Sequence, residues 1–349
     1  MSLRICFAIH SPHGDAILDP EYCEEHPLGG TGTAVIKLAQ SLRRLGADVT
    51  VATKPSQIPA NQLDVFVLAR HWELFGEGTR PAKLNYLWCQ DDVDQLLIHR
   101  MKTSGKMEQV YQACDGLIMV SHYQALRWVA EMSAPPDKIF ISTNGIDLPR
   151  FKPLDTTAKR EPRAYYASTP FRGLAELLQF WPIVRQVVGP RARLSICSSL
   201  KVYGEPEAPN YEALYAQARQ MDGVDYLGSV GQRQLREVAA TCRALAYPCV
   251  FPETSCIVAM EAMAAGCVVV GTSLGALPET AWRNPLALLG EGWGDRWIEA
   301  LLRVFTDDAY YAMLAEENVR HAQLTGWDSV ARKWLTQFQT DLGKKQASA

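Results

Sequence analysis

The sequence lacks any apolar run of about 20 residues, the length that a transmembrane helix requires. It also lacks the apolar stretch and small-residue cleavage site of a signal peptide near Met1, because the chain passes directly into the strand-like segment Leu3–His10. These absences argue against a membrane span and against secretion. We therefore expect a cytoplasmic protein.

Paired cysteines are missing as well. The nine cysteines are an odd number, include no Cys-x-x-Cys pair and are scattered singly through apolar segments. This distribution is typical of reduced thiols in a protein core. No group of His, Cys, Asp and Glu has the spacing of metal ligands, and no Gly-x-Ser-x-Gly segment of a serine hydrolase occurs. The sequence therefore predicts no metal and no cofactor.

A strong charge of one sign is also absent. The 35 basic and 38 acidic residues leave a net charge of −3, which provides no bulk attraction to nucleic acid. We expect no nucleic-acid partner. The length of 349 residues and the hydrophobic fraction of 48% suit two ordinary domains, each able to bury its own core.

Short apolar runs alternate with segments of helical period along most of the chain. The predicted strands are Leu3–His10, Asp48–Thr53, Leu63–Arg70, Leu84–Gln90, Gly116–Ser121, Ile139–Thr143, Ala164–Ser168, Leu194–Ser199, Val224–Gly228, Ala244–Pro248 and Cys267–Thr272. Apolar strands that are separated by helices are typical of parallel sheets buried on both faces. The pattern therefore predicts an α/β protein with two Rossmann-like parallel-sheet domains.

A segment rich in proline and charge separates the two halves. It lacks both the helical and the strand period, as a linker does. The predicted boundaries are 1–150 for the N-terminal Rossmann-like domain, 151–162 for the linker, 163–325 for the C-terminal Rossmann-like domain and 326–349 for a final helix.

The segment Phe251–Gly266 is the most informative in the chain, because Glu253 and Glu261 bracket the start of a predicted helix. Thr254 or Ser255 can cap this helix, and a helix start beyond a strand end offers free N–H groups and a positive dipole end to a phosphate. A sugar nucleotide fits this pattern.

The two acidic residues have distinct predicted roles. Glu253 precedes the first turn and can accept hydrogen bonds from hydroxyls of a group attached to the diphosphate. Glu261, about two turns further at ~1.5 Å per residue, can reach a ribose diol. The alternative is that Glu253 interacts only with the helix dipole and that Glu261 is a solvated surface residue.

The segment resembles the Glu-x7-Glu signature of retaining GT-B glycosyltransferases of the family 4-like class. Four further motifs follow in the order of that family: Gly29-Gly-Thr-Gly32, Asn144-Gly-Ile-Asp147, Arg172-Gly173 and Ala276-Leu-Pro-Glu-Thr280. The resemblance spans most of the chain. It implies two domains that face each other across a cleft, with the acceptor on the N-terminal domain and the nucleotide sugar on the C-terminal domain. It also implies that the final helix, with Trp327 and Trp334, crosses back to the N-terminal domain.

The resemblance implies transfer of a hexosyl group, with retention, from a nucleotide diphosphate sugar to an acceptor hydroxyl. UDP is the favoured nucleotide, and polysaccharide, glycolipid or glycoconjugate synthesis is the expected setting. A saccharide or lipid-linked acceptor is expected, and the latter allows peripheral contact at the inner membrane face. Two alternatives stay open, a nucleotide-sugar 2-epimerase of the same fold and a non-catalytic sugar-nucleotide-binding subunit.

The motifs and the resemblance together assign three groups of site residues. The catalytic candidates are Glu253, Arg172 and Asp91. The donor-binding candidates are Gly29, Gly30, Thr31, Ser168, Arg172, Thr254, Ser255, Cys256, Ile257 and Glu261. The candidates on the acceptor side are His13, Gln90 and His122.

Two positions depart from the family pattern. The second basic residue, expected five or six residues before Arg172, is replaced by Tyr166 and Ala167. Either Arg172 carries the leaving-group charge largely alone, or another base such as Lys201 substitutes. Gln90 stands where a His-Asp pair is frequent, and an amide cannot take a proton at neutral pH, which leaves Asp91 as the candidate base.

Overall fold

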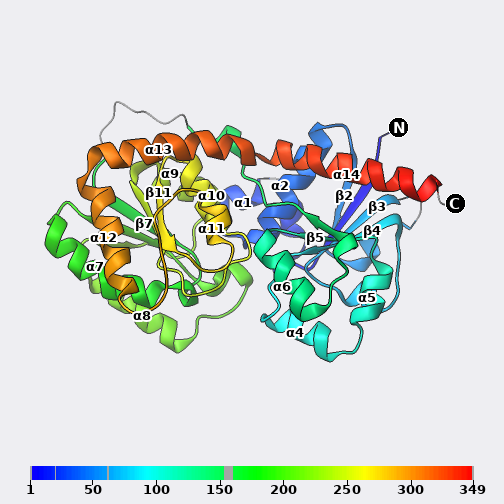
Figure 1. Cartoon of the computed structure of the whole chain (residues 1–349), viewed down its shortest axis with the longest axis horizontal. Coiled ribbons are helices and arrows are strands. Elements are labelled where there is room, and N and C mark those ends of the chain that lie inside the picture. The colour runs from blue at the N-terminus through cyan, green and yellow to red at the C-terminus, as the bar shows by residue number, and fades with distance from the viewer. Residues whose placement is uncertain (1, 20, 61–62, 153–159, 348–349) are drawn as a thin grey trace. The chain divides into compact units, whose positions relative to one another are not determined.

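The computed structural model describes residues 2–19, 21–60, 63–152 and 160–347. The chain divides into two compact units, visible in Figure 1. The first unit comprises Met1–Tyr22, Gly30–Gly145 and Thr325–Ala349, and the second comprises Cys23–Gly29 and Ile146–Leu324. Residues 153–159, the larger part of the predicted linker 151–162, lie outside the described residues.

The first unit is built on a six-stranded parallel sheet with the strand order β2-β1-β3-β4-β5-β6. Its strands are β1 (Arg4–Ile9), β2 (Asp48–Ala52), β3 (Leu63–Ala69), β4 (Ala82–Cys89), β5 (Gly116–Met119) and β6 (Ile139–Ile141). Its helices include η1 (Gly14–Leu18), α2 (Gly30–Arg44), α3 (Glu73–Gly76), α4 (Leu96–Thr103), α5 (Met107–Ala113), α6 (His122–Met132) and α14 (Trp327–Ala347). Figure 1 shows α2 and α14 on one side of this sheet and α4, α5 and α6 on the other.

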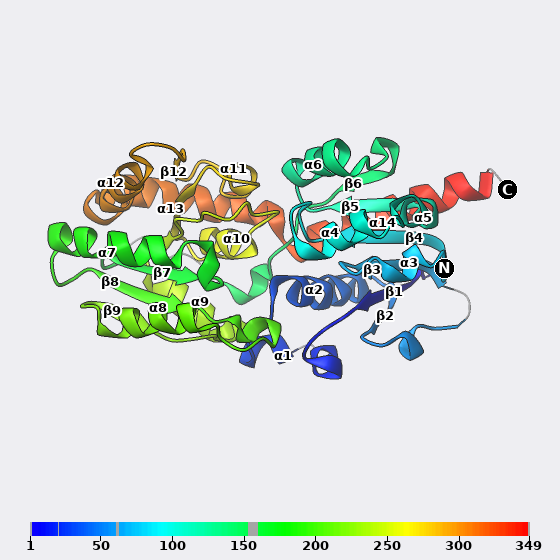
Figure 2. The same ribbon diagram turned by 90° about the horizontal axis from the view of Figure 1, so that it is seen from below.

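The C-terminal helix α14 closes one face of the first sheet. It runs beside α2 and across β4, as Figures 1 and 2 show from two directions. Side chains alternate between the two faces of a strand, and on this face the Trp334 ring lies 4.8 Å from Trp88 and 6.0 Å from Phe7. The indole of Trp334 also donates a hydrogen bond of 2.7 Å to Ser142 Oγ. The last helix is therefore part of the core of the first unit.

The Asn144–Asp147 motif contains a glycine that is required by close packing and not by its backbone conformation. Neither Asn144 nor Gly145 has a positive φ. Instead, a Cβ atom on Gly145 would lie 2.7 Å from Trp327 Cδ2, closer than carbon atoms can approach. Glycine is needed here because the first residue of α14 packs directly on the backbone.

The second unit repeats the architecture with the strand order β12-β11-β10-β7-β8-β9. Its strands are β7 (Arg163–Ala167), β8 (Arg193–Cys197), β9 (Val224–Tyr226), β10 (Ala244–Ala246), β11 (Val268–Thr272) and β12 (Leu286–Ala287). Its longer helices are α7 (Leu174–Val188), α8 (Pro209–Gln220), α9 (Gln232–Thr241), α10 (Ile257–Ala264), α12 (Trp293–Thr306) and α13 (Asp308–Ala322). Right-handed crossovers place α7 and α8 on one face with α12, and α9 and α10 on the other with α13 (Figure 1).

These two sheets confirm the predicted pair of parallel-sheet, Rossmann-like halves. Of the segments with a helical period that separate the strands, His122–Met132, Leu174–Val188 and Gln232–Thr241 form α6, α7 and α9. Parallel strands present the ends of their connecting loops at one edge of the sheet. Each unit therefore has a carboxyl edge on which loop residues gather.

Residues Cys23–Gly29 lie with the second unit, although they precede most of the first. Glu24 and Glu25 form ion pairs with Arg236 and Arg233 on α9. A Cβ atom on Gly231 would lie 2.5 Å from the Glu24 carbonyl oxygen, so the segment packs tightly against the start of α9. The two segments are more than 200 residues apart in the sequence, so the periodicity of the sequence does not predict their contact.

Candidate donor site in the second unit

Glu253 is the centre of a buried polar cluster at the carboxyl edge of the second sheet. Glu253 is only 5% exposed to solvent. The Tyr247 hydroxyl donates to Glu253 Oε1, and Arg172 Nη1 lies 3.3 Å from the same oxygen. Ser168 Oγ is 3.2 Å from the Tyr247 hydroxyl. The structure thus brings together three predicted site residues, Ser168, Arg172 and Glu253.

Tyr247 belongs to this cluster and is not among the predicted site residues. It follows β10 directly, and its ring is fully buried. Burial, together with the nearby Cys249 and Glu253, raises the pKa of Tyr247 well above its ordinary value. The phenol therefore stays protonated and donates to the carboxylate. Its position at the carboxyl end of a predicted strand is the signal that could have indicated it.

The backbone of Glu253 is held by the loop after β11. Ala276 N–H donates to the Glu253 carbonyl at 2.7 Å. Gly275 has a φ of +62°, and a Cβ atom there would lie 2.5 Å from both N and O of Glu253. Further along, the Thr280 hydroxyl donates to the Ser255 carbonyl. The motif Ala276–Thr280 therefore supports the loop that presents Glu253.

Arg172 is held between two aromatic rings. Its guanidinium carbon is 4.8 Å from the ring centre of Phe251 and 5.4 Å from that of Phe171, distances that suit cation–π contacts. Only 22% of the side chain is exposed. Burial opposes the charged form, but the Glu253 carboxylate together with Tyr203, Tyr247 and Cys249 outweighs it, and the pKa of Arg172 lies well above its ordinary value. The guanidinium is therefore a fixed positive charge.

Two polar atoms of this cluster are buried without a hydrogen-bond partner in the part of the chain that the structure describes. They are Arg172 Nε and Thr169 Oγ1, both in the segment that follows β7. Leaving such an atom unpaired costs about 1–3 kcal/mol. Native proteins keep few of these atoms, and a ligand group is one common reason.

Helix α10 begins later than the sequence predicts. Its N-cap is Cys256, in a left-handed conformation with φ of +68°, and neither predicted cap residue, Thr254 or Ser255, fills that position. The reason is tertiary, because the loop before the helix is pinned at Glu253 and Ser255 by the segment after β11. Cys256 makes no side-chain cap bond. The N-cap residue therefore provides no side-chain acceptor for the first N–H groups of α10.

Glu261 lies on the partly exposed face of α10. Ile257, Val258 and Glu261 are half-buried, whereas the other residues of the helix are buried. Residues at positions i, i+1 and i+4 share one side of a helix. At ~1.5 Å per residue, Glu261 lies about 6 Å along the axis from Ile257. The carboxylate is thus one turn from the helix start, on the face that is not buried in the core.

The glycine motif that supplies the other predicted donor residues spans the boundary between the two units. Gly29 belongs to the second unit, where a Cβ atom on this residue would lie 3.0 Å from Cε1 of the Tyr203 ring. Gly30 and Thr31 form the first turn of α2 in the first unit, and the glycine motif has no residue with positive φ. Lys201, the possible second base, is an exposed residue of η6 (Leu200–Tyr203) after β8, and its side chain has no ion pair within the described residues.

The catalytic candidate Asp91 and the acceptor-side candidates follow strands of the first sheet, at its carboxyl edge. Asp91 follows β4, is 5% exposed and accepts a hydrogen bond of 2.6 Å from Arg70 Nε. His13 Nδ1 is 3.3 Å from the Tyr22 hydroxyl. His122 is exposed at the start of α6, and Gln90 is half-buried. Arg70 is a further charged residue at this edge that the sequence did not single out.

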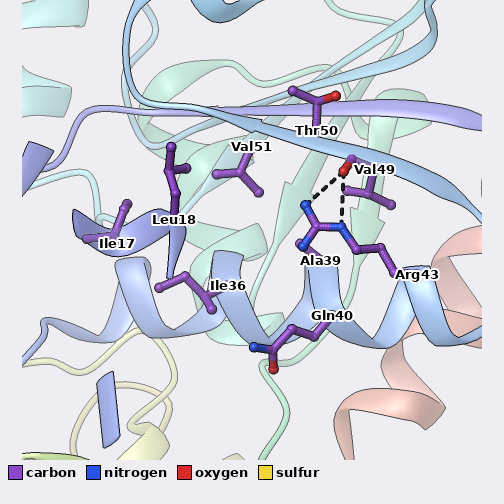
Figure 3. Close-up of a pocket in the computed structure, with 9 residues that line it drawn as sticks. All are labelled: Ile17, Leu18, Ile36, Ala39, Gln40, Arg43, Val49, Thr50 and Val51. Carbon is purple, nitrogen blue, oxygen red and sulfur yellow. Dashed lines mark hydrogen bonds between the residues drawn. The ribbon is translucent and has the colours of Figure 1, made fainter. Parts of the chain in front are cut away.

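A separate pocket of about 310 Å³ lies in the first unit between η1, α2 and β2 (Figure 3). Apolar side chains such as Leu18, Ile36 and Val51 line it. Arg43 donates from Nε and Nη2 to the Val49 carbonyl at 3.1 and 2.8 Å, so both of these nitrogens already have a hydrogen-bond partner in the pocket wall. None of the predicted site residues lines this pocket.

Two kinds of feature are absent from the described residues. No group of three or more His, Cys, Asp and Glu side chains in that part of the chain is placed to hold a metal ion. Across the same residues, every helix is too short or too polar to cross a bilayer.

Comparison with protein families supports a glycosyltransferase. A family model described as glycosyl transferases group 1 matches residues 164–307, the segment that contains Arg172, Glu253 and Glu261. Similar curated proteins include the D-inositol 3-phosphate glycosyltransferase of Streptomyces avermitilis, 25% identical over 87% of this chain and 81% of that protein. The protein of the same name from Kribbella flavida is 28% identical over 89% of this chain and 91% of its own length.

Solved structures share the fold at low sequence identity. Sucrose-phosphate synthase from Thermosynechococcus elongatus superposes with a TM-score of 0.71 at 15% identity, covering 97% of this chain and 98% of that one. Anabaena HepE, solved in complex with UDP and glucose, gives a TM-score of 0.72 at 14% identity over 97% and 100% of the two chains. These similarities confirm the predicted GT-B fold. Residues 164–307 thus match a glycosyl transferases group 1 domain within a GT-B fold, which supports a glycosyltransferase.

Proposed function

We propose that this protein is a retaining glycosyltransferase that moves a hexosyl group from a nucleotide diphosphate sugar to an acceptor hydroxyl. UDP is the favoured nucleotide. The acceptor is a saccharide or a lipid-linked saccharide, with peripheral membrane contact in the latter case. The observation that carries the proposal is the buried contact between Arg172 and Glu253, beside the start of α10, whose N-cap residue makes no side-chain cap bond.

The charge of Arg172 suits a leaving diphosphate. When the bond to the anomeric carbon breaks, negative charge develops on the phosphate oxygens, and preorganised donors stabilise it most effectively. Arg172 is held by two aromatic rings and by Glu253, so it needs little reorganisation during the reaction. The N–H groups at the start of α10 add the positive end of a helix dipole.

Glu253 and Glu261 provide binding energy that orients the donor. One oxygen of Glu253 is engaged by Tyr247 and Arg172, and we propose that the carboxylate accepts hydrogen bonds from the sugar hydroxyls. Glu261, on the partly exposed face of α10, then accepts from the ribose. The departing phosphate takes the acceptor proton on the same face of the sugar, which accounts for retention and needs no metal ion.

The direct test is incubation of the protein with UDP-, GDP- and ADP-hexoses, in the presence and absence of EDTA. We expect slow release of the nucleoside diphosphate without an acceptor and no effect of EDTA. Nuclear magnetic resonance of a transfer product should show the anomeric configuration of the donor. Formation of an epimer would instead indicate an epimerase, and no turnover of any donor would contradict the proposal.

Glu261→Ala should weaken nucleotide binding. Loss of a charged hydrogen-bond acceptor from a ribose diol corresponds to about a 10-fold higher Kd for UDP. Isothermal titration calorimetry measures the change, with Glu316→Ala, an exposed glutamate of α13, as the control. Equal affinities for the wild type and Glu261→Ala would remove Glu261 from the donor site.

A further inference from the structure

Arg70 has a strained backbone at the carboxyl edge of the first sheet. It is the first residue after β3 and has a φ of +70°, a conformation that costs a residue with a long side chain about 1–3 kcal/mol. Two contacts with the end of β4 hold it. Its N–H donates to the Trp88 carbonyl at 2.9 Å, and its Nε donates to Asp91 Oδ2 at 2.6 Å.

The ion pair uses only part of the guanidinium. An arginine has five N–H donors, and Asp91 engages the single donor on Nε. Within the described residues, the two terminal nitrogens of Arg70 have no hydrogen-bond or ion-pair partner. The side chain is 40% exposed, whereas Asp91 is buried. Asp91 therefore fixes the orientation of a guanidinium whose outer donors stay available.

Neighbouring groups add polar donors at the same edge. His71 follows Arg70, and its ring lies 5.2 Å from that of His10, which follows β1. Strands β1, β3 and β4 are adjacent in the sheet, so these residues come from three neighbouring strand ends. Burial is the largest cause that lowers the pKa of His71, and the positive charge of Arg70 acts in the same direction, whereas Glu73 and Asp91 raise it. His71 is therefore a neutral partner, and Arg70 supplies the positive charge.

We propose that Arg70 binds an anionic group, a phosphate or a carboxylate, of the sugar acceptor. A planar fork of charged donors matches both groups, and arginine keeps its charge at any working pH. A purely structural ion pair requires neither a left-handed backbone nor four unused donors. Arg70 is thus a specificity-determining residue, with Asp91 as its positioning residue. The identity of the ligand as the acceptor rests on the proposed function.

The test is calorimetric titration of the full-length protein, without donor, with glucose 6-phosphate, glucuronate, inorganic phosphate and glucose. We expect at least one anionic probe to bind at least 10-fold more tightly than glucose. Binding of the phosphates alone identifies a phosphate site, and binding of glucuronate alone identifies a carboxylate site. Equal binding of all four probes, or binding of none, would overturn the inference.

The variant Arg70→Gln should lose the preference for the anion by at least 10-fold, and Arg70→Lys should retain part of it. The matched control is Arg80→Gln, because Arg80 also pairs with an aspartate, Asp115, but precedes β4 at the opposite edge of the sheet. An unchanged preference in a folded Arg70→Gln protein would overturn the inference. UDP binding, measured in parallel, reports on the proposed function separately and should be unchanged in all three variants.

Discussion

Arg172→Gln should lower kcat for glycosyl transfer by about 100- to 1,000-fold, the loss that follows removal of one preorganised donor to a developing anion. The physical reason is that Arg172 is the buried positive charge of the Glu253 cluster, and glutamine keeps hydrogen-bonding capacity without charge. Release of the nucleoside diphosphate at saturating donor measures kcat. Because the pKa of Arg172 is raised above its ordinary value, its charge is constant through neutral pH.

The matched control for this prediction is Arg193→Gln. Arg193 also forms an ion pair, with Asp225 at 2.8 Å, but it lies at the first residue of β8, at the amino edge of the same sheet. Its replacement should leave kcat within about twofold, as expected for an exposed pair. If Arg172→Gln retained the wild-type rate while remaining folded, the role of Arg172 in leaving-group stabilisation would be excluded.

Among glycine-to-alanine substitutions in the second unit, Gly173→Ala should lower the stability most. Gly173 has a φ of +105°, and a Cβ atom there would lie 2.1 Å from the Pro248 carbonyl oxygen. Backbone strain and overpacking together correspond to about 3 kcal/mol or more. For a unit of this size we expect Tm to fall by about 6–12 °C. Differential scanning calorimetry of the variant measures the shift.

Gly189→Ala separates strain from steric overlap. Gly189 ends α7 with a φ of +85°, yet no atom lies within 4 Å of an added Cβ. Its ψ of −169° places it in a backbone region that is essentially restricted to glycine, so this variant should show only the conformational cost, about 1–3 kcal/mol. A Tm for Gly173→Ala equal to that of Gly189→Ala would mean that the contact with Pro248 contributes nothing, and that the loop carrying Arg172 is not held as tightly as described.

The architecture could be predicted from the sequence because its determinants are local. Uninterrupted apolar runs such as Val65–Leu68 and Val268–Val270 are buried on both faces of their sheets, and helical periods separate them. Glycines at helix ends and capping residues such as Ser121 then determine the first or last residue of several helices. The Glu253 and Arg172 positions were also predicted, since both follow strands and the carboxyl ends of parallel strands share one edge.

Other features of the site could not be predicted because they depend on contacts between distant segments. Tyr247 resembles any apolar strand residue until the fold places its hydroxyl on Glu253. The late start of α10 at Ile257 results from Gly275 and Ala276 holding the preceding loop. Arg70 carries no motif, and only its left-handed backbone and its pairing with Asp91 distinguish it from other surface arginines.

The sequence by itself determined the two parallel-sheet halves and the carboxyl edges on which charged residues gather, because hydrophobic periodicity and strand-end geometry act over a few residues. Only the tertiary structure decided which side chains meet at those edges. That choice depends on the packing of loops far apart in the chain, on the burial that keeps Tyr247 protonated and Arg172 charged, and on backbone strain that local sequence does not encode.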